Sequence, residues 1–92
     1  MIVRWTPAAL RDLESLHARV AEDNFPTAAA TVERILSGIE ALSRHPNMGR
    51  KGRVADTREL IISPYIVVYL PKATALELLA IIHSARRWPE SF

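Results

Sequence analysis

The sequence contains no cysteine and only three glycines and six prolines among its 92 residues. The absence of cysteine excludes a disulfide framework, a thiolate nucleophile and a thiolate metal site, and it is consistent with a reducing cytoplasm. Hydrophobic residues make up 49% of the chain, and low-complexity sequence is missing, which argues against disorder. We therefore expect a globular fold that rests on packing alone.

Long apolar stretches are also missing. Runs such as 78–82 are far too short to cross a bilayer, and the first residues lack a basic start followed by an apolar stretch. We expect neither export nor membrane insertion, and a cytoplasmic location. A chain of this length has room for one core, which predicts a single domain over residues 1–92.

Charge is unevenly distributed. Residues 1–43 carry four Arg against six acids, a net charge of −2, whereas residues 44–92 carry eight Lys or Arg against four acids, a net charge of +4. The basic half suits an acidic partner, and it equally suits a solvated surface with a slight bias. Composition does not choose between these interpretations.

The first half of the chain predicts one strand and two helices. A β-prone run at 2–5 is followed by Thr6 and Pro7, which suit a helix N-cap and its first position. Apolar residues then recur at helical spacing over 8–20 and again between the breaks at 23–26 and 44–46. With so short a break between them, the helices should form an antiparallel hairpin.

The second half predicts a basic loop at 46–53 and strands at 58–62, 65–70 and 76–84. The last strand is apolar in both phases, with Leu78, Ala80 and Ile82 expected on one side and Leu79 and Ile81 on the other, so we place it in the centre of the sheet. The predicted fold is α+β: an N-terminal strand, a helical hairpin and a three-stranded antiparallel meander that completes one sheet. The helices cover one face, and a partner is a reasonable cover for part of the other.

Several kinds of site are excluded by spacing. No histidine pair has metal-ligand spacing, so we expect no metal site, and neither a phosphate-binding loop nor a serine triad is present. His83 is either an acid/base group or a polar residue at a strand end. The remaining chemistry is cationic, with tyrosines and a tryptophan as candidate stacking surfaces, and it suits phosphates and protein interfaces equally. These residues are Arg50, Lys51, Arg53, Arg58, Arg86, Arg87, Tyr65, Tyr69 and Trp88.

An ordered set of short motifs resembles the ParE-type toxins of the RelE/ParE superfamily, which belong to type II toxin–antitoxin systems. The motifs are WTPAALRDL at 5–13, PNMGR at 46–50, TREL at 57–60, YIVVY at 65–69 and IIHSARRWP at 81–89. Each piece is short, but together they span nearly the whole chain, and the order of elements is that of the superfamily. The resemblance implies a growth-arresting toxin of the kind that stabilises plasmids.

The superfamily has two functional branches. RelE-like members are ribosome-dependent mRNA endoribonucleases that aim cations at the reacting phosphate. Where they place a catalytic Arg, this chain has Leu60, Ile61 and Ile62, so Arg58, His83 and Arg86 are the only nuclease set that the resemblance leaves. Resemblance to the ParE branch implies a poison of DNA gyrase, and the pattern establishes no catalytic residues for that action. We favour this branch, which needs no cofactor, and keep the endoribonuclease as the alternative.

Two partners follow from the resemblance. DNA gyrase would contact the basic loop and tail, through Arg50, Lys51, Arg53, Arg86, Arg87 and Trp88. A ParD-like antitoxin would lay a helix along the hairpin, with a strand added against the sheet as a further option, and form a hetero-oligomer, through Leu10, Leu13, Leu16, Val20, Val32, Ile35 and Ile39. We expect no sequence-specific DNA binding by the toxin alone. Arg58 is expected to be structural, in a pair with Glu77 or Glu90.

Overall fold

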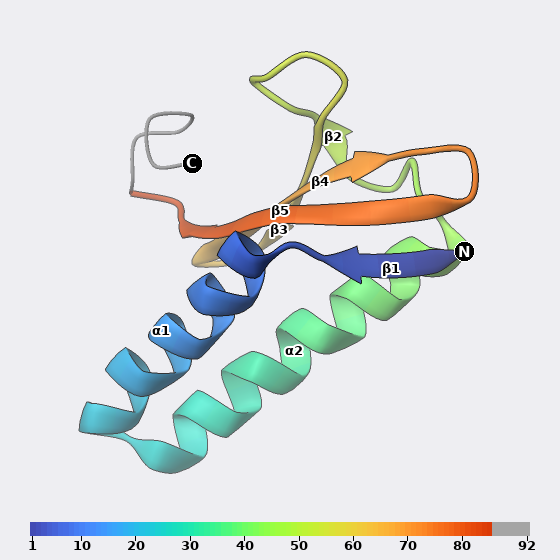
Figure 1. Cartoon of the computed structure of the whole chain (residues 1–92). Coiled ribbons are helices and arrows are strands. Elements are labelled where there is room, and N and C mark those ends of the chain that lie inside the picture. Colours follow the sequence, from blue (N-terminus) through green and yellow to red (C-terminus); the bar gives the residue numbers. More distant parts are fainter. Residues whose placement is uncertain (86–92) are drawn as a thin grey trace.

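A single five-stranded sheet carries two helices on one face in the computed structural model, which describes residues 1–85 (Figure 1). In chain order the elements are β1 (Ile2–Trp5), α1 (Pro7–Asp23), α2 (Phe25–Arg44), β2 (Arg50–Lys51), β3 (Arg58–Ile62), β4 (Tyr65–Pro71) and β5 (Ala75–His83). The predicted α+β class and order of elements are confirmed. The two-residue strand β2, inside the predicted loop, was not anticipated. None of the helices in this part of the chain is long and apolar enough to span a membrane.

Two caps set the ends of the helical hairpin. Thr6 caps α1, since its Oγ1 accepts a hydrogen bond from the Ala9 N–H at 3.2 Å. Asn24 serves both helices: its N–H donates to the Val20 carbonyl at 2.9 Å, and its Oδ1 accepts from the Thr27 N–H at 3.0 Å. One residue therefore ends α1 and begins α2, which forces the sharp reversal between them.

The sheet order is β1-β5-β4-β3-β2, so β5 lies between β1 and β4, as its two apolar phases predict. β1 runs parallel to β5, and the other neighbouring strands are antiparallel. Beyond the end of β1, α1 lies against the edge of β5. There the Asp12 Oδ2 accepts a hydrogen bond from the Ile81 N–H at 2.9 Å and ties the helix to the sheet.

A β-bulge in β5 alters the predicted facing of its side chains. Val68 pairs with Ala80, but Tyr69 pairs with Leu78, so Leu79 is left without a partner on β4. Leu78 and Ile81 consequently both enter the core beneath the helices, whereas Ala80 and Ile82 face the other side. The prediction that Leu78 shares a face with Ala80 and Ile82 is therefore wrong, because the extra residue shifts the alternation by one.

The apolar side chains form two clusters. The main core lies between the helices and the sheet and contains Ala9, Leu16, Ile35, Ile39, Leu42, Tyr65, Val67, Tyr69, Leu76, Leu78 and Ile81. The second lies on the sheet face away from the helices, hereafter the open face, and contains Ile66, Val68, Ala80 and Ile82, with Val54 and Leu79 packed against it. The loop between β2 and β3 rises on this side of the sheet (Figure 1).

Candidate functional surfaces: the basic loop and the hairpin groove

The basic loop, residues 46–57, is bound to the sheet by one buried tyrosine on the helix side. The Tyr69 hydroxyl donates to the Pro46 carbonyl at 2.7 Å and accepts from the Gly49 N–H at 3.0 Å. A Cβ at position 49 would lie 2.7 Å from that hydroxyl and 2.9 Å from the Glu59 carbonyl oxygen, so only glycine fits without a shift. Burial raises the pKa of Tyr69 above its usual value, which keeps the hydroxyl available as a donor.

Arg58 supports the same loop. Its Nη1 donates to the Gly49 carbonyl at 2.6 Å and to the Asn47 carbonyl at 3.3 Å. The expected carboxylate partner is wrong for Glu77, which pairs with Lys72 at 3.2 Å, while Glu90 lies outside the described residues. Arg58 thus acts on loop backbone carbonyls, and this arrangement favours the predicted structural role.

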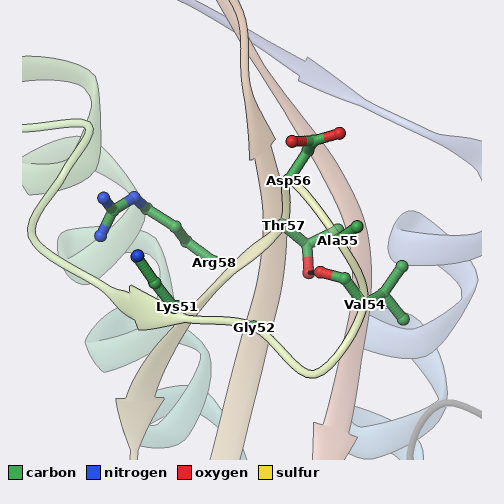
Figure 2. A pocket seen from close by; sticks show the side chains of 7 residues that line it. All are labelled: Lys51, Gly52, Val54, Ala55, Asp56, Thr57 and Arg58. Carbon is green, nitrogen blue, oxygen red and sulfur yellow. Dashed lines mark hydrogen bonds between the residues drawn. The ribbon is translucent and has the colours of Figure 1, made fainter.

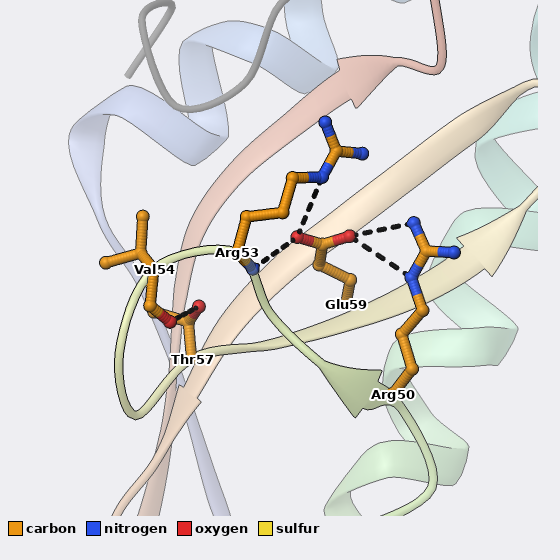
Figure 3. A network of polar contacts seen from close by, with 5 residues as sticks. All are labelled: Arg50, Arg53, Val54, Thr57 and Glu59. Carbon is orange, nitrogen blue, oxygen red and sulfur yellow. Dashed lines mark hydrogen bonds and ion pairs between the residues drawn. The ribbon is translucent and has the colours of Figure 1, made fainter.

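A buried carboxylate holds the loop from the open face (Figure 3). The side chain of Glu59 is 1% exposed, and its Oε1 accepts from Nε and Nη2 of Arg50 at 3.3 and 2.9 Å. Its Oε2 accepts from the Arg53 N–H at 3.1 Å and lies 3.6 Å from the Arg53 Nε. Both guanidinium groups remain half exposed, and Figure 3 shows their outer nitrogens directed away from the carboxylate.

Opposing effects set the charge of Glu59. Burial raises the pKa of this carboxyl, but the Arg53 N–H, the Arg50 hydrogen bonds and the two positive charges outweigh it, so the pKa lies below the usual 4.5. Glu59 is therefore ionised at neutral pH. The Glu59 carboxylate holds the guanidinium groups of Arg50 and Arg53 in place. This edge of the open face therefore carries a net positive charge in a fixed geometry.

A second part of the loop forms a shallow hollow of about 340 Å³ (Figure 2). Lys51 and Arg58 are paired across β2 and β3 and point to the same side of the sheet as Tyr69. The hollow is closed by a turn in which the Thr57 hydroxyl donates to the Val54 carbonyl at 2.7 Å. Asp56 has a φ of 68°, a left-handed conformation that Asp tolerates better than most residues. Arg50 and Arg53 thus bind Glu59 on the open face, whereas Lys51 and Arg58 lie on the side of the sheet that faces the helices.

The nuclease set is not brought together within residues 1–85. Arg58 pairs with Tyr69 and His83 with Tyr65, so they lie four residues apart along β4, about 13 Å, and on strands either side of it. The His83 Nδ1 accepts a hydrogen bond from the Ala85 N–H at 3.1 Å. The remaining member, Arg86, lies outside the described residues, as do Arg87 and Trp88 of the predicted target surface.

One further expectation needs correction, and one site residue was missed. Tyr65 and Tyr69 were candidate stacking surfaces, but Tyr69 is fully buried, and Tyr65 is buried except where it borders a hollow that it lines with Val20 and His83. Glu59 was not predicted as a site residue. Its signal in the sequence is a lone acid inside a β-prone run that follows a cluster of cations, a pattern that indicates a charge partner but does not say which cation it meets.

The hairpin presents an apolar groove to solvent. Between α1 and α2 lies a hollow of about 270 Å³ lined by Leu13, Glu14, His17 and Val32. Leu10 and Leu36 are 46% and 45% exposed, and Phe25 is also exposed, with its ring 5.8 Å from the ring of His17. We call the surface formed by Leu10, Leu13, His17, Phe25, Val32 and Leu36 the hairpin groove.

The predicted antitoxin stripe is only partly at the surface. Leu16, Ile35 and Ile39 are buried in the chain's own core, so the prediction that they contact a partner is wrong. Leu13 and Val32 line the groove and Leu10 borders it, whereas Val20 lines a separate hollow with Tyr65 and His83. The centre of an amphipathic stripe packs on the sheet, and only its border remains for a partner. Phe25 and Leu36, which lie on that border, were missed.

Comparison with known families settles the relationship. Residues 3–88 match the family described as the ParE toxin of type II toxin-antitoxin system, parDE. The chain belongs to the ParE toxin family. The match includes residues 46–50, which are held by Tyr69 and Glu59, so this part of the basic loop belongs to the region that defines the family.

Similar proteins agree with the ParE assignment. The chain is 38% identical over 90 residues to Y4kP of Sinorhizobium fredii, which is named as a toxin, and the match covers 96% of this chain and 93% of that protein. The chromosomal ParDE toxin-antitoxin system of P. aeruginosa contains a chain with the same fold, with a TM-score of 0.82 and 24% identity over 90% of this chain and 95% of that one. The toxin-antitoxin complex RelBE2 of Mycobacterium tuberculosis gives a TM-score of 0.63 and 29% identity over 89% and 95%. The ParE and RelE branches thus share this fold.

Proposed function

We propose that the chain is a growth-arresting cytoplasmic toxin that acts on DNA gyrase without catalysing a reaction of its own, and that a ParD-like antitoxin silences it by direct binding. The family match supports the ParE branch over residues 3–88. The observation that carries the choice is the apolar centre of the open face, because the two cations at its edge, Arg50 and Arg53, are already bound to the buried Glu59 carboxylate.

A nuclease of the RelE kind needs positive charge where the reacting phosphate gains negative charge. The centre of the open face is apolar instead, formed by Ile66, Val68, Ala80 and Ile82, and the carboxylate of Glu59 lies next to Val68 across the strand pair. A phosphate over the centre of this face would meet hydrocarbon rather than cations. The half-exposed Arg50 and Arg53 lie at the edge, where they suit a protein or DNA contact.

The antitoxin contact is supported by the hairpin groove and by the similar structures, which come from a ParDE system and a RelBE2 complex. A groove of exposed leucines beside a partly buried valine fits the apolar side of a helix. We place the antitoxin there and the gyrase contact at the basic loop.

Inducible expression in bacteria with a supercoiled reporter plasmid tests the proposal. Gyrase poisoning is expected to yield cleaved plasmid and an SOS response with intact messages, and co-expression of the antitoxin encoded beside the gene is expected to restore growth. Shortened messages without plasmid cleavage would instead establish the endoribonuclease alternative. Normal growth on full expression of the folded chain would show an inactive relative.

A further inference from the structure

The acidic and basic side chains of the hairpin differ in where they lie relative to the hairpin groove. Glu14 lines the groove, and Glu33, next to the groove residue Val32 on α2, is exposed. Residues 1–85 contain no ion pair to either carboxylate. Because residues three and four positions apart are neighbours on a helix surface, Glu33 lies beside the groove residue Leu36, and both acids lie along the border of the groove.

The cations of the hairpin are directed elsewhere. The Arg34 Nη2 donates to the Ser63 carbonyl at 2.9 Å, on the side of α2 that faces β3. Arg19 lines the hollow beside Tyr65 and His83, on the sheet side of α1. Arg44 is paired with Glu40 at 2.8 Å near the end of α2. The remaining cation, Arg11, is exposed three residues before Glu14 and is not among the residues that line the groove.

We infer that the segment of the antitoxin that occupies the hairpin groove is a helix whose apolar stripe is flanked by lysine or arginine. The inference rests on the proposed function and adds the chemistry of its partner. The leucines and Val32 supply the apolar contact, which any amphipathic helix would satisfy. Glu14 and Glu33 select among such helices, because they attract basic flanks and repel acidic ones.

Two synthetic peptides separate these contributions. Both are about 16 residues long with leucines at helical spacing, and they differ only in carrying lysine or glutamate at the positions that flank the stripe. Fluorescence anisotropy of the labelled peptides against the purified chain is expected to give a Kd about tenfold lower for the lysine peptide, since exposed charge pairs each contribute little. The difference should shrink as salt is raised from about 0.05 M to 1 M.

Charge reversal in the chain completes the test. The double variant Glu14→Lys/Glu33→Lys is expected to reverse the preference and bind the glutamate peptide more tightly. Glu33→Lys alone is expected to remove most of the preference. The matched control is Glu22→Lys, which makes the same change of net charge at an exposed position on another side of α1 and should leave the preference unchanged.

The inference is overturned if the wild-type chain binds both peptides equally, binds neither, or responds to Glu22→Lys as it does to Glu33→Lys. Growth assays keep this result distinct from the proposed function. If the antitoxin of the adjacent gene rescues wild-type chain and the double variant equally well in co-expression titrations, the charge selection is wrong and the toxin–antitoxin function stands. If that antitoxin rescues neither chain, the proposed function fails.

Discussion

The basic loop lies at the edge of the sheet beside β2 and β3, the hairpin groove lies between the two helices, and the two are built by different physics. The loop is fixed by directed polar contacts: Tyr69 and Arg58 bind its backbone, and Glu59 binds the side chains of Arg50 and Arg53. The groove is an apolar surface that the chain leaves open, with Leu10 and Leu36 nearly half exposed. A surface that must present charges in one geometry is pre-organised, whereas a surface that another chain will cover needs only shape and hydrophobicity.

The difference also concerns what each surface contributes to the fold alone. Breaking a buried contact at the loop leaves charged groups without partners, which lowers the free energy of unfolding. Removing an exposed apolar side chain from the groove removes surface that the isolated chain gains little from burying. Substitutions at the two surfaces should therefore separate stability from binding.

The largest effect is expected for Glu59→Gln, which keeps the shape of the side chain and removes its charge. The free energy of unfolding should fall by about 2 kcal/mol, because hydrogen bonds to a buried charged group weaken together. Urea unfolding followed by circular dichroism measures this, and toxicity on induction should fall with it. The exposed Glu14→Gln is the control and should change stability by less than about 0.5 kcal/mol. An unchanged midpoint for Glu59→Gln would contradict the role given to this carboxylate.

Acid should reproduce the same loss in the wild-type chain. The pKa of Glu59 is lower in the folded chain than the usual 4.5, so its contribution is complete above about pH 4.5 and is lost as the pH falls through the folded value. The stability difference between wild type and Glu59→Gln should therefore be constant near neutral pH and shrink below about pH 4.5. Urea titrations of both proteins at a series of pH values measure it. A difference that persists unchanged down to about pH 2 would mean that charge is not what Glu59 supplies.

The smallest effect on stability is expected for Leu36→Ser in the groove, within about 0.5 kcal/mol of wild type. The same variant should weaken binding of the antitoxin about tenfold, because it removes one apolar contact from the interface. Its buried neighbour gives the matched comparison: Ile35→Val should cost about 1 kcal/mol of stability and leave the affinity unchanged. Calorimetric titration and urea unfolding measure the two quantities. If both variants altered affinity alike, the groove would not be the docking surface.

The elements of this fold were accessible from the sequence because their signals are local. Thr6 with Pro7 marks a helix start, and the double apolar phase of 76–84 marks a central strand. The facing of Leu78 and Ile81 was not accessible, because the bulge at Leu79 is set by pairing with β4 and leaves no trace in the apolar pattern.

The candidate surfaces were less accessible than the fold. That 46–53 is a basic loop follows from its composition, but Tyr69 meets Gly49 across 20 residues of chain, and no local pattern specifies such a contact. The apolar periodicity likewise identified the apolar residues of the helices, but it did not show which of them the sheet would cover. Ile35 and Leu36 are adjacent and both apolar, yet one is buried beneath the sheet and the other borders the groove.

The bond between Asp12 and the Ile81 N–H has a consequence for how the chain avoids other copies of itself. β5 is central only along the length of β1; past Leu78 that edge no longer has a strand beside it. An apolar strand with free N–H groups is a template on which a second chain can add, and repeated addition leads to aggregates. Here α1 lies along that edge, and a carboxylate occupies one of its N–H groups. Asp12 therefore blocks this N–H group from pairing with a strand of another chain. Such protection matters most after the chain is synthesised and before a partner binds it.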